Sequence, residues 1–397
     1  MKAKDIFKDE NFINCLKKGT YDDKDNYVEI FNEENEIIEE NINKVTKINC
    51  SGYWITNIEG ISIFINLKYL YLSNNQIRKL PKEIDRLKNL KYLSLFDNQI
   101  EELSSKIGNL EKLETLDLSY NQIKKLPKEI GNLKNLKVLN LSYNQLQGLP
   151  KEIWKLENLK YLNLRHNELQ KIPKEIFQLK ALKELNLWSN WIETISEEIG
   201  NLINLKKLDL SFNQIKKLPK EIGNLINLEI LDLIWNKLRW LPKKIFNLKN
   251  LKELDLGFNK IETIPKEIEK LINLWWLNLS NNQMKEIPKE ICNLENLEIL
   301  MLKDNQLQWL PEEILKLDKL QQIWLHNAFD LDNLKQDPKE LRDILRKLKR
   351  KKVYSDGGLT YFRKKVYPIL IKKIKEKYKI DDLKQIKDNL NLNNLNF

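Results

Sequence analysis

Aromatic side chains recur at one fixed place along this chain. Every 23 residues, one position is filled in turn by Asn74, Asp97, Tyr120, Tyr143, His166, Ser189, Phe212, Trp235, Phe258, Asn281 and Asp304. Polar residues therefore occupy both ends of this column, and rings fill its middle. Exposed tyrosine and tryptophan side chains are typical anchors of protein interfaces. The chemistry that these residues offer is contact with another protein.

The rings of the column and their neighbours predict a partner-binding surface. Its candidate residues are Tyr120, Tyr143, Tyr161, His166, Trp188, Trp191, Phe212, Trp235, Phe258 and Trp276. Tyrosine and phenylalanine could instead serve the framework, because a ring at such a position can lie over the next repeat. Tryptophan favours the binding interpretation, since it is a rarer choice for a passive exposed position. A nearby row of Asp117, Asp209, Asp232 and Asp255 alternates with asparagines, which is compatible with a cation-seeking patch or with ordinary variation along a strand face.

Residue patterns for catalysis or metal binding are missing from the sequence. Its two histidines, His166 and His326, are too far apart to share a metal, and no phosphate-binding loop, dinucleotide-binding glycine motif or paired-cysteine metal motif occurs. Cys292 is expected to have a structural role. We therefore predict that the protein is not an enzyme and has no catalytic residues, no cofactor, no metal site and no small-molecule substrate.

Composition and cysteine content predict a cytoplasmic protein. The 397 residues are 42% hydrophobic and 31% charged, enough to bury a core and keep a polar surface. No apolar stretch reaches the ~20 residues of a membrane helix, and charges stand in MKAKDIFKDE where a signal peptide would be apolar. The three cysteines, Cys15, Cys50 and Cys292, are odd in number and far apart, which argues against a disulfide framework.

The elements that must position the rings form an internal repeat. Its 23-residue units begin at Leu67, Leu90, Leu113, Leu136, Leu159, Leu182, Leu205, Leu228, Leu251, Leu274, Leu297 and Leu320, and a shorter unit precedes them from Val45. That makes thirteen coils. One coil cannot bury its apolar side alone, and stacking against neighbours makes the core continuous.

Each unit combines a strand pattern with a short helical turn. The segment LxxLxL alternates apolar and other residues, so leucines such as Leu116 and Leu118 should point inward while Asp117 and Ser119 point outward. The proline of the following LPxEIxxL segment suits the first position of a helical turn. Ser104 replaces it in one coil and Ser196 in another, and serine is a good helix N-cap.

An asparagine recurs at the ninth position of the units. It occupies Asn75, Asn98, Asn121, Asn144, Asn167, Asn190, Asn213, Asn236, Asn259, Asn282 and Asn305. A side-chain amide both donates and accepts hydrogen bonds, so it can satisfy the backbone where the chain leaves the strand. We expect a structural ladder. Its interruption at Tyr53 and Ala328 marks the first and last coils, because terminal repeats are usually atypical.

The pattern LxxLxLxxNxI followed by xxLPxEIxxL resembles the leucine-rich repeat family, specifically its 23-residue LPxxI type. That type is found in Ras-suppressor-like intracellular proteins and in many bacterial repeat proteins. The resemblance covers Val45 to about Asn327. It implies an α/β solenoid, a right-handed horseshoe with a parallel sheet on its concave face and short helical turns on its convex face. It also implies use as a protein-binding scaffold, and it carries over no catalytic residue.

The two flanks of the repeat differ in charge. Residues 1–43 hold twelve Asp or Glu against six Lys or Arg, with apolar residues at helical spacing. They are expected to cap the solenoid, with an autonomous interaction helix as the alternative. Residues 335–380 hold seventeen Lys or Arg against five Asp or Glu, enough to account for the net charge of +11. Asp337 and Pro338 should start a helix there, which could be a cap, a protein-docking element or a contact for nucleic acid or anionic membrane.

Together these patterns predict three regions: an acidic helical N-terminal cap over residues 1–44, a leucine-rich repeat solenoid over 45–327 and a basic helical cap or tail over 328–397. The predicted function is a non-enzymatic scaffold that binds a partner protein on its concave face, in a setting such as intracellular signalling. The alternative is binding of nucleic acid or an anionic membrane surface through the basic C-terminal segment.

Overall fold

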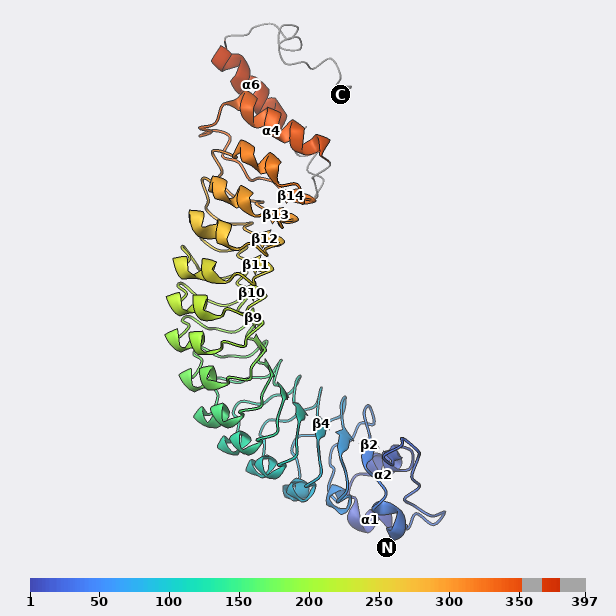
Figure 1. The fold of residues 1–397 in the computed structure, drawn as a ribbon. Coiled ribbons are helices and arrows are strands. Elements are labelled where there is room, and N and C mark those ends of the chain that lie inside the picture. Colours follow the sequence, from blue (N-terminus) through green and yellow to red (C-terminus); the bar gives the residue numbers. More distant parts are fainter. Residues whose placement is uncertain (352–365, 379–397) are drawn as a thin grey trace. The chain divides into compact units, whose positions relative to one another are not determined.

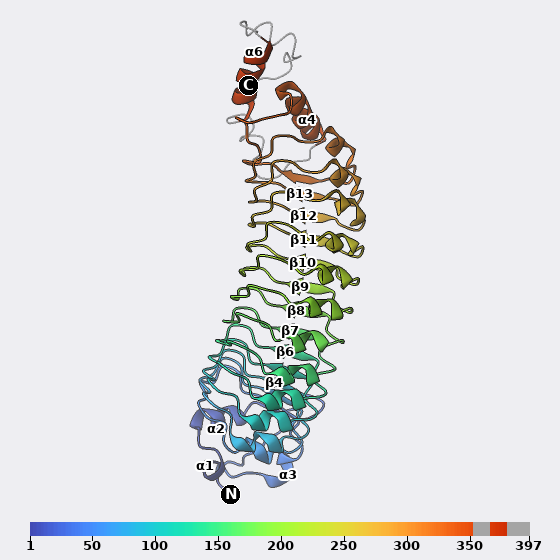
Figure 2. The same cartoon turned by 90° about the vertical axis from the view of Figure 1, so that its left-hand side faces the viewer.

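The computed structural model describes residues 1–351 and 366–378. The chain forms two compact units, Met1–Asp232 and Leu233–Phe397. Both repeat the same coil, in which a three-residue strand is followed by a turn and a short 3₁₀-helix (Figures 1 and 2). Within the first unit the strands lie on the inner side of the bend and the 3₁₀-helices on its outer side (Figure 1).

The strands pair in sequence order within each unit, and paired residues of the repeats are one 23-residue unit apart. In the first unit β1 is antiparallel to β2, and the later strands are parallel. These strands are β1 Thr20–Tyr21, β2 Lys47–Asn49, β3 Tyr69–Tyr71, β4 Tyr92–Ser94, β5 Thr115–Asp117, β6 Val138–Asn140, β7 Tyr161–Asn163, β8 Glu184–Asn186, β9 Lys207–Asp209 and β10 Ile230–Asp232. The second unit has the parallel strands β11 Glu253–Asp255, β12 Trp276–Asn278, β13 Ile299–Met301 and β14 Gln322–Trp324.

The helical turns of the repeat are all of the 3₁₀ type. They are η1 Ile61–Ile63, η2 Lys82–Arg86, η3 Ser105–Asn109, η4 Lys128–Asn132, η5 Lys151–Lys155, η6 Lys174–Gln178, η7 Glu197–Asn201 and η8 Lys220–Asn224 in the first unit. The second unit has η9 Lys243–Asn247, η10 Lys266–Lys270, η11 Lys289–Asn293 and η12 Glu312–Lys316. These strands and turns confirm the predicted α/β repeat solenoid.

The start of the helical turns differs in detail from the prediction. The prolines occupy the N-cap, with an extended backbone such as φ −67° and ψ 147° at Pro127, so the expectation of the first helical position was wrong. Ser104 accepts a hydrogen bond from the Lys106 amide and is the predicted cap. Ser196 makes no cap bond, because its hydroxyl donates to Glu198 instead.

The core is a column of leucine and isoleucine side chains that runs through the coils. Leu116, Leu118 and Ile130 are inaccessible to solvent, and the equivalent residues of the other coils are also buried. Ser119 was expected to point outward but is buried, because its hydroxyl contacts Asp117 and Asn140. The seventh position of this coil is therefore covered, and its side chain is small.

The asparagine ladder is confirmed and joins successive coils. The Nδ2 of Asn121 donates to Leu95 O of the preceding coil at 2.9 Å and to Leu118 O of its own strand at 3.0 Å. Its Oδ1 accepts the Ile100 amide at 2.9 Å. The same three bonds recur at Asn98, Asn144 and Asn167. Each asparagine thus satisfies buried backbone groups that no neighbouring strand reaches.

The N-terminal flank packs on the first coil. It contains α1 Ala3–Ile6, α2 Glu10–Leu16 and α3 Glu39–Ile42. The ring of Phe7 contacts those of Phe12, Phe31 and Phe64, the last from the first repeat coil, with centroids 5.5 to 6.2 Å apart. Buried rings therefore tie the flank to the end of the core, and the capping role of residues 1–44 stays a prediction.

Asp9 fixes the start of α2 against the first coil. Its carboxylate accepts the Phe12 amide at 3.0 Å and the Thr56 amide, Thr56 hydroxyl and Asn57 amide at 2.7 to 3.1 Å. Burial by itself would raise the pKa of Asp9, but these hydrogen bonds outweigh it and hold the pKa below its usual value. The charged form of Asp9 therefore stabilises this packing.

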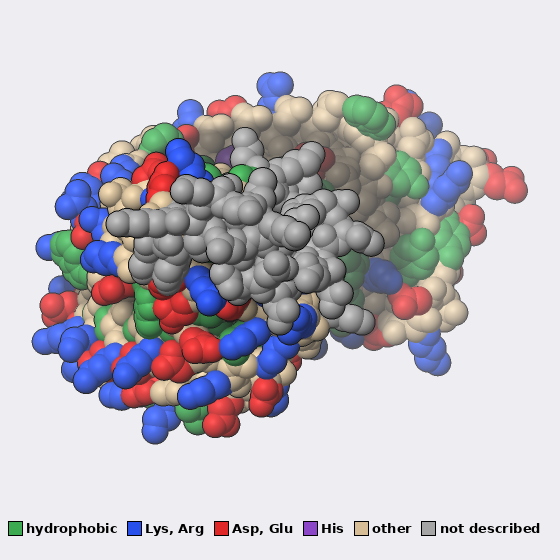
Figure 3. All heavy atoms as spheres, turned by 90° about the horizontal axis from the view of Figure 1, so that it is seen from above, with side chains coloured by type: hydrophobic (Ala, Val, Ile, Leu, Met, Phe, Trp, Pro, Cys, Tyr) green, Lys and Arg blue, Asp and Glu red, His purple; other side chains and the backbone are tan. Residues whose placement is uncertain are grey.

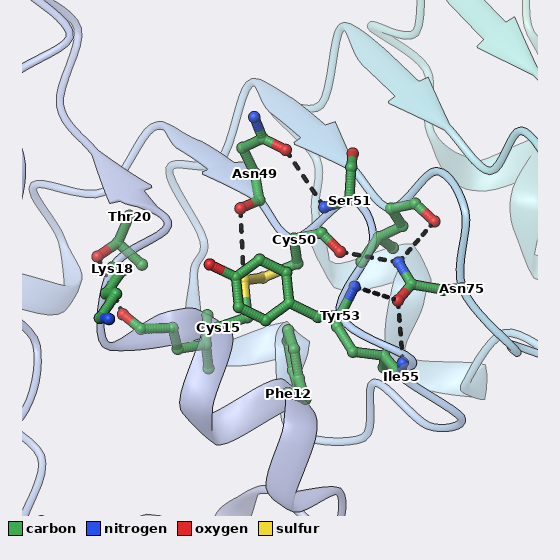
Figure 4. Close-up of a disulfide and its surroundings, with 12 residues drawn as sticks. Phe12, Cys15, Lys18, Thr20, Asn49, Cys50, Ser51, Tyr53, Ile55 and Asn75 are labelled. Atoms are coloured by element: carbon green, nitrogen blue, oxygen red, sulfur yellow. Dashed lines mark hydrogen bonds between the residues drawn. A yellow bond between two sulfur atoms is a disulfide. The ribbon is translucent and has the colours of Figure 1, made fainter.

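Cys15 and Cys50 form a disulfide, so the expectation of no disulfide was wrong for this pair. Although 35 residues separate them, α2 lies against the end of β2 and brings their Cα atoms to 5.5 Å (Figure 4). The Cys15 sulfur also lies 3.4 Å from the Asn49 carbonyl oxygen. Sequence spacing gave no sign of this contact because it depends on how the flank folds back.

The C-terminal flank begins with the predicted helix. Asp337 caps α4 Pro338–Arg350 by accepting the Lys339 and Glu340 amides, and proline stands in its first turn. The helix buries Leu341, Ile344, Leu345 and Leu348, as its spacing predicted. It is followed by α6 Tyr367–Tyr378. The two glycines Gly357-Gly358 would be expected to break a helix, but they lie outside the described residues.

Two lysines of this flank bind the coil that begins at Leu297. Lys347 lies 2.8 Å from Glu312, and Lys351 lies 3.6 Å from Asp318. This coil reads LPEEILKLDK and has Glu312 where most other coils carry a lysine, so it offers an extra carboxylate to the basic helix. The charge of α4 is therefore matched in part by the coil that it covers.

The asparagine ladder predicts that replacing a ladder asparagine lowers the free energy of unfolding more than replacing an asparagine elsewhere in the coil. Replacing Asn121 with alanine should lower the free energy of unfolding by about 2–4 kcal/mol, because it leaves three buried backbone groups without partners. The control is Asn135→Ala, which removes one exposed bond from Asn135 to Glu111 O and should cost about 0.5–1 kcal/mol. Urea unfolding followed by circular dichroism measures both. Equal losses would contradict the ladder's role.

A second prediction concerns the charge of Asp9. Asp9→Asn should destabilise the cap by about 1–2 kcal/mol at pH 7. The folded-state pKa is lowered, so the stabilisation is complete above the ordinary value of about 3.9 and is lost as the pH falls through the lowered value. Urea midpoints of both proteins at pH 7, 5 and 3 should therefore converge only at the lowest pH. A gap that persists unchanged at pH 3 would contradict this assignment.

The disulfide gives a third prediction. Unfolded, unreduced protein should react with one maleimide per chain, at Cys292, and with three after reduction. Cys15→Ser with Cys50→Ser should destabilise by about 3–4 kcal/mol, since closing a 35-residue loop limits the unfolded chain. Cys292→Ser is the matched control, and its unfolding should keep the sensitivity to reductant. Three reactive thiols without reduction would disprove the pairing.

Candidate functional site

The eighth position of every complete coil has a left-handed backbone. Its φ angles lie between 51° and 56°, at Asn74, Asp97, Tyr120, Tyr143, His166, Ser189, Phe212, Trp235, Phe258, Asn281 and Asp304. Asparagine and aspartate tolerate this conformation best, whereas aromatic side chains are strained in it. The rings in the middle of the column therefore carry a backbone cost that the polar residues at its ends largely avoid.

The fifth position bends each strand into this conformation. The side-chain oxygen of Asn163 accepts the Arg165 amide at 3.1 Å, and that of Asn186 accepts the Trp188 amide at 2.9 Å. The aspartates behave alike, since Asp117 accepts the Ser119 amide at 3.0 Å. The aspartate row thus works as part of the framework, and its carboxylates are engaged with their own backbone.

In the first unit the rings form a continuous run across successive coils, which we name the ring run. Successive centroids are 5.2 Å apart for Phe96–Tyr120, 4.1 Å for Tyr120–Tyr143, 4.7 Å for Tyr143–His166, 6.0 Å for His166–Trp188 and 5.2 Å for Trp188–Phe212. Tyr120 remains 44% exposed and Phe212 41% exposed. A hydrogen bond with the Tyr143 hydroxyl raises the pKa of Tyr120, so the Tyr120 phenol stays neutral near pH 7. The run is an apolar strip with hydroxyl groups, open to solvent.

Arg165 lies within the ring run. Its guanidinium carbon is 4.1 Å from the centre of the Trp188 ring and 5.3 Å from that of Tyr143. Its Nε is shielded from solvent and has no hydrogen-bond partner. The sequence interpretation missed this residue. The available signal was that Ser119, Ser142 and Ser211 occupy its position in other coils, so an arginine there is a departure.

A shallow hollow of about 300 Å³ opens on the sheet face beside Arg165. It lies over β6 to β9 and is lined by Tyr161, Asn163, Asn186, Glu184 and Lys207, among others. Tyr161 is 39% exposed at this place. The hollow therefore combines a phenol ring, amide groups and charges within the first unit.

The remaining candidates differ in their exposure and in their ring contacts. Within the second unit, Trp235 stacks on Phe258 with centroids 4.2 Å apart, and Trp235 is 47% exposed. Trp276 is half-buried on β12. Trp191 is 57% exposed and has no ring contact among the described residues. Of the ten candidates, the structure thus brings together Tyr120, Tyr143, His166, Trp188 and Phe212.

Cys292 fits the expected structural role. It follows the isoleucine of a helical turn, where other coils place glycine or phenylalanine, and it is buried. Burial raises the pKa of Cys292 to about 12. A thiol of this kind is protonated at neutral pH and is a poor nucleophile.

Comparison with known proteins agrees with this geometry. A family model described as a leucine-rich repeat region matches residues 43–121, 107–214, 193–274 and 259–356. A solved leucine-rich repeat protein of Leptospira interrogans is 33% identical, with a TM-score of 0.52, over 78% of this chain and 96% of its own. The plant peptide hormone receptor RGFR1, solved in complex with RGF2, is 34% identical, with a TM-score of 0.63, over 68% of this chain and 45% of its own.

An internalin of Listeria monocytogenes shares the fold, at 24% identity and a TM-score of 0.70, over 84% of this chain and 94% of its own length. None of the curated proteins matches the chain. The family match runs through nearly all of the coils described above, in both units. This chain belongs to the leucine-rich repeat family.

Proposed function

We propose that this protein is a non-enzymatic recognition module that binds a partner protein on the sheet face of its first unit, through the ring run. The observation that carries the proposal is the strained backbone under the rings. Tyr120, Tyr143 and Phe212 occupy left-handed positions that Asn74 fills at lower cost. Tyr120 and Phe212 leave much of their surface exposed, and Tyr143 is half-buried. Burying those rings against a partner would recover the apolar contact that the free protein lacks.

Relatives of this fold support a protein ligand. Leucine-rich repeat proteins generally serve as interaction scaffolds, and RGFR1 is solved with the peptide RGF2 bound. We infer a scaffold role in signal transduction for this chain, because the sheet face offers recognition surfaces and Cys292 is unsuited to attack a substrate.

The Cys15–Cys50 disulfide bears on the cellular compartment in which the protein meets its partner. No helix in the described parts of the chain combines the length and apolar character needed to cross a bilayer. The cytoplasmic location predicted from the sequence rested in part on unpaired cysteines, and the Cys15–Cys50 bond removes that part of its support. Because disulfides persist in oxidising compartments, we propose that the partner is met outside a reducing cytosol.

The alternative function, binding of nucleic acid or an anionic membrane through the basic C-terminal segment, gains no support from the described residues. Lys347 and Lys351 face carboxylates of the coil that begins at Leu297. Outside the grey atoms of Figure 3, basic and acidic side chains are mixed on the surface shown. We therefore propose a capping role for α4.

The proposal predicts that binding and stability can be separated. The triple variant Tyr143→Asn, Trp188→Ser and Phe212→Asn installs the residues that other coils carry at these positions, as in Asn74 and Ser119. Partner capture from whole-cell and extracellular fractions should fall at least about tenfold, which is the loss of one well-buried anchor. The thermal midpoint should stay the same or rise, because asparagine fits the left-handed backbone.

The matched control is Trp154→Glu, which removes a 37% exposed tryptophan from η5 and installs the residue that η10 carries as Glu269. It should capture the partner as the unaltered protein does, as measured by quantitative mass spectrometry. A triple variant that unfolds at markedly lower temperature would show that the rings are framework. Undiminished capture by a folded triple variant would place the binding surface elsewhere.

A further inference from the structure

Arg165 is a positive charge without a counter-ion among the described residues. The rings of Tyr143 and Trp188 hold its guanidinium, and its Nε has lost water without gaining a hydrogen bond. Removing a charged group from water is costly unless an opposite charge or hydrogen bonds compensate. The stacked rings also limit the motion of the side chain, so the remaining guanidinium nitrogens are presented in a fixed orientation.

The charged residues around Arg165 leave its guanidinium without an ion pair. Lys183 and Lys207 are exposed on neighbouring coils, and neither forms an ion pair within the described residues. By contrast, Lys137 is paired with Glu114 at 2.6 Å and Lys206 with Glu229 at 3.0 Å. Glu184 lines the hollow, and Asp209 lies beside Asn186 with a carboxylate oxygen on the Ser211 amide. Neither carboxylate pairs with Arg165 within the described residues, so its charge stays available to a negatively charged ligand.

The hollow adds hydrogen-bond donors. The side-chain oxygens of Asn163 and Asn186 are used by the backbone amides of Arg165 and Trp188. Their Nδ2 groups donate to no partner among the described residues, and both residues line the hollow on the open sheet. Amide donors, a fixed guanidinium and flanking lysines are suited to a ligand that supplies acceptors and negative charge. The adjacent rings are suited to apolar side chains of the same ligand.

We propose that the sheet face of the first unit binds an extended acidic segment of the partner protein, with an aspartate or glutamate carboxylate of that segment on Arg165. This inference rests on the proposed function and names the chemistry of the partner. The carboxylate accepts two parallel bonds from the guanidinium, as arginine favours. Apolar residues beside it pack on Tyr120, Tyr143 and Phe212, and Lys183 and Lys207 supply long-range attraction.

The test starts from a displayed library of random dodecapeptides, selected on the full-length protein. The peptides are fused at their C-termini, so the library contains no free C-terminal carboxylate. Selected sequences are then synthesised with acetylated and amidated ends, and their affinities are measured by fluorescence anisotropy. Each acidic residue is replaced in turn by glutamine or asparagine, and binding is repeated at low and high salt.

The expected result is enrichment of peptides with Asp or Glu at a fixed distance from an apolar residue. Arg165→Gln should weaken their binding by about tenfold or more, the loss of one charge-assisted pair. Arg165→Lys should weaken their binding less, because lysine keeps the positive charge but lacks the two parallel N–H donors of the guanidinium. Lys183→Gln with Lys207→Gln should mainly reduce the salt dependence. Arg78→Gln, an exposed arginine outside the ring run, is the control and should bind normally.

Other outcomes would overturn this inference. Peptides without acidic enrichment that still lose binding in the triple ring variant would leave the proposed function intact and remove the acidic ligand. Enrichment of no peptide would also reject it. So would acidic peptides that bind Arg165→Gln as tightly as they bind the unaltered protein. Partner capture by the unaltered protein tests the proposed function separately.

Discussion

Each coil of this protein depends on its neighbours for hydrogen bonds that it cannot make alone. After its three-residue strand the chain turns sharply, and the backbone groups of that turn are buried. An asparagine such as Asn121 satisfies them by bridging Leu95 O, Leu118 O and the Ile100 amide, which lie in two coils. Since buried unpaired groups are costly, a single coil is unstable and stacking is required.

The same turn also shapes the functional surface. It forces the eighth residue into a left-handed backbone, and the fifth residue reinforces that bend by accepting an amide two residues ahead. The side chain at the eighth position therefore projects at a constant place in every coil. Rings placed there in consecutive coils come within stacking distance, as Tyr120 and Tyr143 do at 4.1 Å. Changing one residue in each coil can thus create a continuous binding strip without altering the repeat framework.

Both ends of the repeat need other solutions, because a terminal coil has a neighbour on one side only. At the N-terminus, Phe7 covers Phe64, Asp9 binds the Thr56 and Asn57 amides, and the Cys15–Cys50 bond fixes α2. At the C-terminus, the apolar face of α4 is buried and Lys347 binds Glu312. At both ends, buried apolar side chains cover the core of the repeat, and charged side chains of the flanks bind specific groups of the adjacent coil.

The sequence alone determined the features that the 23-residue period encodes: the strands, the helical turns, the buried leucines, the asparagine ladder and the column of rings. These follow from local patterns, in which each residue type has the same surroundings in every coil. The helix at Asp337 was also predictable, since its cap and apolar spacing are local. Tertiary structure decided the rest. The disulfide depends on α2 folding back over 35 residues, and the place of Arg165 depends on Tyr143 and Trp188, which come from the coils on either side. No periodic pattern encodes such contacts, because they occur once and join residues that are distant in the chain.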